Sequence, residues 1–311
     1  MPDRDASNPK RLDPDIIASI ENMKTLLSND PRRRAEMERA LAVEKILIQK
    51  GVNELKKEII EKSPHEQLTF SFLPNEMTRI SPFSPMSRSE MGSRAIVKQM
   101  FNNPWGTMEL QGERLSVFDE SVLLGVLKLA TINKSFMYTT TFHELLGIMG
   151  TTSGKNTYNA VRSSLDRLTG TFVKITIKSK DTIKTGLSNH ILSHVKYNKF
   201  NFDIKIDEYF GGIYLEGLIT SIDLDFRAGL KGDITKAMYR FYEGQPVSFE
   251  IHIDKLCDAI NLDKTQQKFE LRKKINKSLK ELHSQGYFEY GKINKKDHIV
   301  TKKNMKTLKN V

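Results

Sequence analysis

The sequence has a single cysteine in 311 residues, and this scarcity excludes two classes of protein. One thiol cannot form a disulfide within the chain, nor can it supply a cysteine cluster for structural zinc. Long hydrophobic runs are missing too, because no stretch approaches the roughly 18 apolar residues that a membrane span needs. The N-terminal segment is polar and has no apolar signal-peptide core. We therefore expect a cytoplasmic protein that makes no use of a membrane.

Negative charge is scarce relative to positive charge. The chain has 49 Lys and Arg against 38 Asp and Glu, which gives a net charge of +11. Residues 252–311 alone hold 15 Lys and Arg against seven Asp and Glu, so they contribute +8 of that total. Such a balance favours polyanionic partners, nucleic acid above all, and it points to the C-terminal part of the chain as the binding region.

The N-terminal quarter predicts an arm rather than a domain. Residues 32–62 have the composition and apolar spacing of an amphipathic helix, which either packs on its own protein or binds a partner. Several prolines follow and indicate a linker that ends near residue 78. Within this linker, residues 67–72 read QLTFSF, and their alternating apolar side chains predict a strand on the following domain.

A compact unit then begins near residue 96 with the element order of a winged helix. Ser116 with Asp119, and Thr141 with Glu144, have the spacing at which a hydroxyl caps free backbone N–H groups and a carboxylate favours the positive helix end. Helices are predicted at 119–131, 141–149 and 155–168. We expect a hairpin of strands at 171–178 and 190–197 around a polar tip, and a further strand at 200–206.

The same order recurs in the last third of the chain, with helices at 233–243, 253–260 and 265–284, a short strand at 247–251, and a hairpin at 287–301. A plan found twice is more informative than either copy. The expected fold class is α+β: two tandem winged-helix domains at residues 79–232 and 233–311, preceded by a flexible and partly helical arm at 1–78.

The third helix of a winged helix enters the major groove of DNA, so one face packs on the core and the other meets bases and phosphates. On a helical wheel of residues 265–284, the core side consists of Leu271, Ile275, Leu279 and Leu282. The opposite side and its flanks are predicted to bind DNA through Gln266, Glu270, Arg272, Lys273, Lys274, Lys277 and Lys280. The predicted wing adds Lys292, Lys295 and Lys296 for the backbone or the minor groove.

The third helix of the first unit has a different outer face. Val161, Leu165 and Leu168 form its core stripe, whereas the opposite side is polar and only mildly basic. Its candidate contacts are Lys155, Asn156, Asn159, Arg162, Ser163 and Arg167. This face predicts either a weaker DNA contact or a protein interface.

Segments that suggest catalysis lack the spacing that catalysis needs. Residues 150–156, GTTSGKN, resemble a phosphate-binding loop, but Met149 stands where the first glycine is required, and Asn156 replaces the magnesium-holding Ser or Thr. His190 and His194 have no accompanying metal motif. We expect no enzymatic activity, no cofactor and no metal.

Three segments together resemble a known family: SPFSPMSRS at residues 81–89, NPWG at 103–106 and LSVFDESVLL at 115–124. They are similar to plasmid replication initiators of the TrfA-like type, and the resemblance covers roughly residues 75–305. It implies two winged-helix domains that bind direct repeats (iterons) at a plasmid origin, melt adjacent AT-rich DNA and bring in host helicase and sliding clamp. The second domain would read the repeat, and the first would touch the DNA backbone or mediate self-association as a homodimer.

In that setting QLTFSF has a second interpretation. It resembles the Gln-Leu-x-Leu/Phe peptides by which bacterial replication proteins bind the sliding clamp, with Gln67, Leu68, Phe70 and Phe72 as the anchors. Two other functions are compatible with the sequence: a tandem winged-helix transcriptional regulator acting at promoters, and a nicking enzyme. The nickase is disfavoured, because His252-Ile253-Asp254 lacks the second histidine of the required metal motif.

Overall fold

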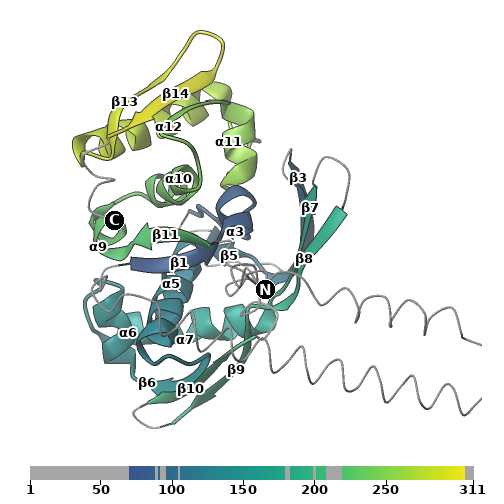
Figure 1. The fold of residues 1–311 in the computed structure, drawn as a ribbon, viewed down its shortest axis with the longest axis vertical. Helices are drawn as coiled ribbons and strands as arrows, with labels where there is room; N and C mark the ends of the chain where they lie inside the picture. Colours follow the sequence, from purple (N-terminus) through teal and green to yellow (C-terminus); the bar gives the residue numbers. More distant parts are fainter. Residues whose placement is uncertain are drawn as a thin grey trace, which may run out of the picture. The chain divides into compact units, whose positions relative to one another are not determined.

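The computed structural model describes residues 70–87, 90–91, 96–103, 106–178, 183–198, 201–207 and 219–304. They belong to one compact unit that spans Ile59–Val311. The amphipathic helix predicted at 32–62, together with Gln67 and Leu68, lies outside the described residues. Within this unit two winged-helix modules are joined through their first helices, which confirms the expected α+β class and the tandem arrangement (Figure 1).

The first module has three helices and a three-stranded sheet: α5 (Val117–Ile132), β6 (Met137–Thr140), α6 (Phe142–Ile148), α7 (Lys155–Gly170), β9 (Leu192–Tyr197) and β10 (Phe202–Ile206). The strands are antiparallel in the order β6-β10-β9. The predicted cap of α5 is confirmed, because Asp119 Oδ2 accepts a hydrogen bond from the Ser116 backbone N–H at 2.6 Å while Ser116 Oγ accepts from the Asp119 N–H. Thr141 likewise accepts from the Glu144 N–H at the start of α6.

One predicted pairing in this module is wrong. The strand expected at 171–178 is β7 (Phe172–Lys178), but it pairs with β8 (Ile183–His190) and not with the strand at 192–197. Together with β3 (Ile96–Asn103) and β4 (Gly106–Glu113) they make a separate sheet in the order β3-β4-β7-β8. Strand pairing is made by backbone groups, so the polar residues expected to form a hairpin tip can join the ladder. The wing of this module is therefore the β9–β10 hairpin.

The second module repeats the first: α10 (Asp233–Glu243), β12 (Ser248–His252), α11 (Ile253–Ala259), α12 (Lys268–Ser284), β13 (Phe288–Ile293) and β14 (His298–Lys303). Its strands are antiparallel in the order β12-β14-β13, which matches β6-β10-β9 strand for strand. The helices and the hairpin lie where the sequence predicts them, except that α12 begins at Lys268 rather than near Thr265.

A smaller set of elements connects the modules. β1 (Phe70–Pro74) pairs with β11 (Ile219–Asp223), α3 (Asn75–Arg79) follows β1, and β2 (Phe83–Ser84) runs parallel to β5 (Leu115–Ser116). Ser71 Oγ donates to the Leu124 carbonyl of α5 at 2.8 Å, and Leu73 and Met77 are fully buried. Residues 70–78, which the sequence assigns to the arm, therefore pack on the modules.

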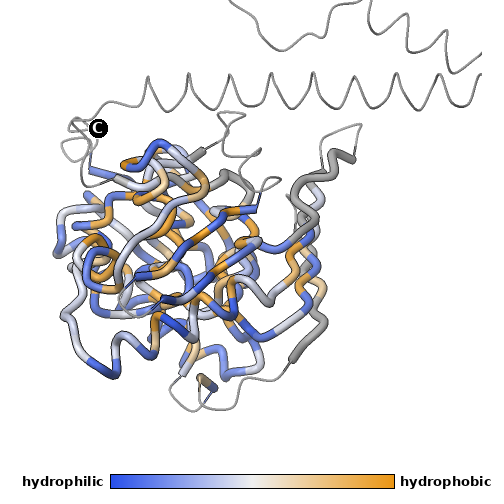
Figure 2. Tube along the Cα trace, turned by 90° about the horizontal axis from the view of Figure 1, so that it is seen from below, coloured by the Kyte–Doolittle hydropathy of each residue, from blue (hydrophilic) through white to orange (hydrophobic). Residues whose placement is uncertain are grey.

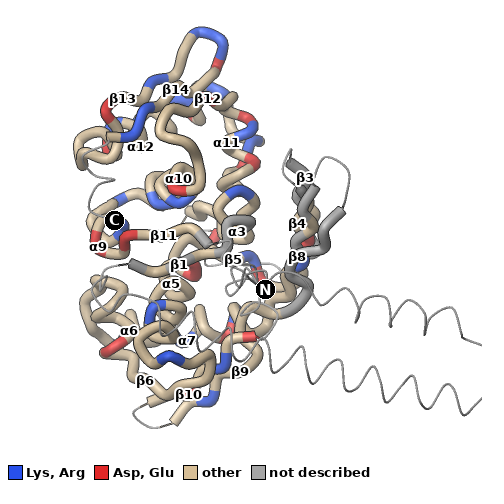
Figure 3. Tube along the Cα trace, viewed as in Figure 1, with Lys and Arg blue, Asp and Glu red and all other residues tan. Residues whose placement is uncertain are grey.

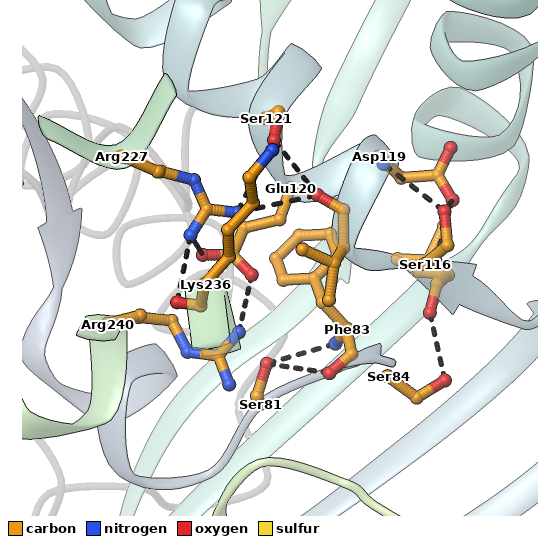
Figure 4. Close-up of polar contacts among 12 residues, drawn as sticks. Ser81, Phe83, Ser84, Ser116, Asp119, Glu120, Ser121, Arg227, Lys236 and Arg240 are labelled. Carbon is orange, nitrogen blue, oxygen red and sulfur yellow. Dashed lines mark hydrogen bonds and ion pairs between the residues drawn. The ribbon is translucent and has the colours of Figure 1, made fainter. Parts of the chain in front are cut away.

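Hydrophobic side chains from both modules form one continuous core, and hydrophobic and polar residues alternate along the elements that enclose it (Figure 2). The junction contains buried charge as well. Arg240 Nη1 on α10 donates to Glu120 Oε2 on α5 at 2.5 Å, and both side chains are fully buried. Arg227 Nη1 on α9 (Leu224–Gly229) lies 3.3 Å from Glu120 Oε1 (Figure 4). Burial lowers the pKa of Arg240, and the Glu120 carboxylate opposes that shift.

Candidate nucleic-acid interface

α12 has the two-faced character that the sequence predicts. Leu271, Ile275, Leu279 and Leu282 are all at most 4 % exposed, so the core stripe is confirmed. The stripe is extended by Ser278, which is also buried. The side of α12 opposite this stripe is exposed to solvent.

The lysines of α12 that were expected to meet DNA are exposed: Lys273, Lys274, Lys277 and Lys280. Gln266 and Glu270 are partly exposed at the start of this face, and the Lys274 ammonium contacts the Gln266 side-chain oxygen. Figure 3 shows Lys and Arg along α12 and at the β13–β14 hairpin. Lys274, Lys277 and Lys280 also line a hollow of about 930 Å³, whose other wall includes Pro85 and Met86. We define the lysine face as the exposed side of α12 that carries these four lysines.

The wing is tied to α12 by charge. The Arg272 guanidinium contacts the Asp297 carboxylate at the hairpin tip, and Lys268 Nζ lies 2.5 Å from Asp297 Oδ2. Asp297 has a left-handed backbone, with φ of 60°, which suits a short polar side chain in a tight turn. This places the exposed Lys292, Lys295 and Lys296 of the hairpin beside the lysine face, and it gives Arg272 a positioning role.

A carboxylate fixes α12 against α10. The N-cap residue of α10 is Gly232, which has no side chain to cap the helix. Glu281 of α12 supplies the missing acceptor: its Oε1 accepts from the Lys231 N–H at 2.6 Å, and its Oε2 accepts from Thr235 Oγ1 at 2.8 Å. A carboxylate is favourable at a helix N-terminus. The direction in which the lysine face points is therefore set by the core and by this contact.

The outer face of α7 is less free. Lys155, Asn156, Asn159 and Ser163 are exposed, as expected, but the Arg162 guanidinium lies over the Tyr197 ring at 4.3 Å from its centre. The Tyr197 hydroxyl donates to Asp166 Oδ1 at 2.7 Å, and burial together with this carboxylate raises the pKa of Tyr197. One cation of this face is therefore held by the wing of its own module.

Arg167 lies inside the first module rather than on the α7 surface. Its side chain is 13 % exposed, and its Nε and Nη2 atoms donate to Asp119 Oδ1 at 3.1 and 2.8 Å. Asp119 is fully buried and also belongs to the cap of α5. Because this ion pair occupies the guanidinium, we leave Arg167 out of the candidate DNA surface.

Comparison with protein families gives a match for part of the chain. Residues 108–243 match the family model described as Initiator Replication protein, WH1. These residues are similar to a replication-initiator WH1 domain, and we label them the WH1 domain. The match runs from β4 to the end of α10, so the WH1 domain contains the first module and Arg227 and Arg240 of the junction. Among curated proteins, none matches the chain.

Two solved structures share the fold of the WH1 domain and the second module together. Both are described as domains 2 and 3 of RctB. One has a TM-score of 0.50 and 11% identity, and the match covers 74% of this chain and 96% of that chain. The other has a TM-score of 0.52 and 11% identity, with 75% and 99% covered. Likeness at this identity concerns the fold, and it agrees with the tandem winged helices.

The structure adds two residues to the lysine face that charge-based selection missed. Phe269 is 70 % exposed, and Asn276 is partly exposed on the same side of α12. On a helical wheel Phe269 lies on the side away from the core stripe and Asn276 lies on the flank of the lysine face, and Asn is a side chain that can pair with adenine. The wheel alone contained this signal, because their spacing from Lys273 and Lys280 is that of one helix face.

The segment QLTFSF is described only in part. Phe70 begins β1, where its backbone is opposite Asp223, and Phe72 is opposite Ser221. This is the strand predicted for these residues. Binding of the same segment to a clamp would require β1 to leave β11.

Three further observations concern segments that the sequence singled out. No helix in the described part of the chain is both long enough and apolar enough to cross a membrane. Residues 151–154 form the turn from α6 into α7, as expected for the loop-like sequence GTTSGKN. Cys257 is fully buried in the core of the second module.

Proposed function

We propose that the chain is a plasmid replication initiator of the TrfA-like type, which binds iterons at the origin, promotes melting of adjacent AT-rich DNA and recruits host helicase and sliding clamp. The observation that carries this proposal is an exposed lysine face on the third helix of a winged helix that is joined to a segment matching the replication-initiator WH1 family. Such a protein acts in the cytoplasm on double-stranded DNA and needs neither an active site nor a cofactor.

The two modules divide the work in this proposal. α12 enters the major groove of each repeat, its lysines neutralise phosphates, and the wing lysines hold the flanking backbone. The WH1 domain touches the backbone weakly or pairs with a second copy of the chain. The free lysine face of α12 and the partly occupied face of α7 support this division.

Melting follows from differential binding. Several copies on neighbouring repeats shift DNA towards a bent or unwound form if they bind that form more tightly than relaxed duplex. Buried ion pairs link the two modules at their junction, and a linked pair of modules is what imposing a shape on DNA requires. Host enzymes then carry out the chemistry of replication.

The salt dependence of binding tests the role of the lysine face. Each lysine that neutralises one phosphate contributes about 0.9 to the slope of log affinity against log salt. We expect Lys273→Ala and Lys277→Ala each to lower the slope by about one and to weaken binding to all sequences equally. Lys134→Ala, which removes the same charge from the exposed turn after α5, serves as the control and leaves the slope unchanged. An unchanged slope in both α12 variants would remove this helix from the proposal.

A transcriptional regulator with the same fold would make the same contacts without opening DNA. Permanganate oxidises unstacked thymines, so it distinguishes the two functions on a supercoiled plasmid that carries the repeats and an AT-rich stretch. We expect the full chain to make thymines of that stretch reactive. Binding to the repeats with no reactive thymine supports the regulator.

A further inference from the structure

Phe269 is an exposed aromatic residue on an otherwise basic surface. It is the second residue of α12, and 70 % of its surface is exposed. At 100° per residue it lies within about 40° of both Lys273 and Lys280 on the helical wheel. Its ring therefore belongs to the lysine face and points away from the core stripe of Leu271 and Ile275.

The position of Phe269 along the helix matters as much as its face. Residues near the N-terminus of a recognition helix contact base edges, whereas flanking cations contact phosphates. Phe269 stands in the first turn, next to the wing-bound Lys268 and one turn before Lys273. In a recognition helix, a large ring at this position would face the base edges on the floor of the groove rather than the phosphates.

A phenyl ring cannot form a hydrogen bond of the kind that distinguishes most base pairs. Thymine alone presents an apolar group, its 5-methyl, in the major groove. We propose that Phe269 packs on the 5-methyl group of a thymine in the bound repeat and is a specificity-determining residue of α12. The inference rests on the proposed function, and it adds a base preference to a surface whose lysines bind any sequence.

Replacing thymine by deoxyuridine tests this contact, because it removes the methyl group and leaves base pairing intact. The probe is a duplex enriched by the full chain from a random library of about 20 base pairs, the span of two helical turns. Each thymine is replaced singly. For the unaltered chain we expect one thymine at which the replacement weakens binding roughly fourfold, the value for one buried methyl group.

The variants then assign that penalty to Phe269. Phe269→Ala binds the thymine duplex more weakly and shows no further loss on deoxyuridine at that position. Phe269→Leu retains an apolar contact and keeps most of the penalty. Tyr290→Ala, which removes another exposed aromatic ring from the wing, leaves the penalty unchanged. Because Phe269 is mostly exposed, its variants should unfold at the same temperature as the unaltered chain, and this is measured alongside.

The possible outcomes separate the two proposals. Enrichment of no sequence by the full chain overturns the proposed function and this inference with it. Enrichment of a sequence in which every thymine has the same deoxyuridine penalty for the unaltered chain and for Phe269→Ala overturns the inference alone. A penalty that Phe269→Ala abolishes supports both.

Discussion

The two winged-helix modules have the same element order and the same strand order, yet the cations on their third helices make different contacts. On α7, one arginine forms an ion pair with buried Asp119 and another lies over the Tyr197 ring. On α12, four lysines stand free of the core, and the arginine and lysine near its start are bound only to the wing tip. The comparison teaches that a shared fold does not leave the same cations exposed on both third helices. The two modules differ in which cations of the third helix are bound by other residues of the same module.

The largest effect is expected at the junction that the modules share. Glu120→Ala leaves Arg240 and Arg227 buried without a counter-charge, and removal of one partner from a buried ion pair costs about 3–5 kcal/mol. Urea unfolding of the full chain measures this. Asp225→Ala, which removes an exposed carboxylate from α9, is the matched control and should cost less than about 0.5 kcal/mol. Equal losses in the two variants would mean that the junction does not couple the modules.

The next effect compares the third helices directly. Lys273→Ala with Lys277→Ala should weaken DNA binding about 30-fold, at roughly 1 kcal/mol for each phosphate contact. Lys155→Ala with Arg162→Ala removes the same charge from α7 and should weaken binding less than about threefold, because Arg162 is already engaged by Tyr197. Filter binding or fluorescence anisotropy at fixed salt gives both values. Similar losses from the two pairs would abolish the distinction between the modules.

Arg167→Ala tests whether an arginine of α7 contributes to stability rather than to DNA binding. It removes two charge-assisted hydrogen bonds to a buried carboxylate, so we expect a loss of about 1.5 kcal/mol in the free energy of unfolding. Affinity for DNA should change less than twofold. A variant of full stability with reduced affinity would return Arg167 to the DNA surface.

The smallest effect concerns the turns that precede the third helices. Before α12, Asp263 accepts hydrogen bonds from the Thr265 N–H and hydroxyl. These bonds lower the pKa of Asp263 below its ordinary 3.8. By contrast, residues 151–154 before α7 contain no acid. A lowered carboxyl pKa stabilises the fold above the ordinary value, and this contribution is lost as pH falls through the folded-state pKa. Asp263→Asn should therefore be slightly less stable at pH 6.

Thermal unfolding of both proteins as a function of pH measures this difference. The two curves should converge once the pH falls below the lowered folded-state pKa of Asp263, where the carboxyl group of the unaltered chain is also uncharged. A difference that persists at the lowest pH would show that the hydrogen bonds of Asp263 do not depend on its charge.

Local signals in the sequence predicted much of the fold. The caps at Ser116 and Thr141 and the stripe of Leu271, Ile275 and Leu279 depend on neighbours within a few residues, and the structure has them where they were expected. The partner of β7 was wrong because strand signals are local and pairing is not. The Glu120–Arg240 contact joins residues 120 positions apart, and no periodicity in the sequence predicts it.

Only part of the candidate site was predicted, because residues were selected by charge. Selecting residues by charge found the lysines of α12, but it also selected Arg167, whose partner Asp119 lies 48 positions away. The same criterion passed over Phe269, although the wheel placed it on the lysine face. The ion pair of Arg167 could not be predicted from local sequence, whereas Phe269 could have been selected from the wheel.

The proposed function depends most on the lysine face of α12 lying against duplex DNA. Acetylation of lysines in the full chain, read by mass spectrometry with and without repeat DNA, tests this directly. We predict that DNA protects Lys273, Lys277 and Lys280 and leaves Lys134 equally reactive. If the three α12 lysines react at the same rate with and without bound DNA, the central claim is contradicted.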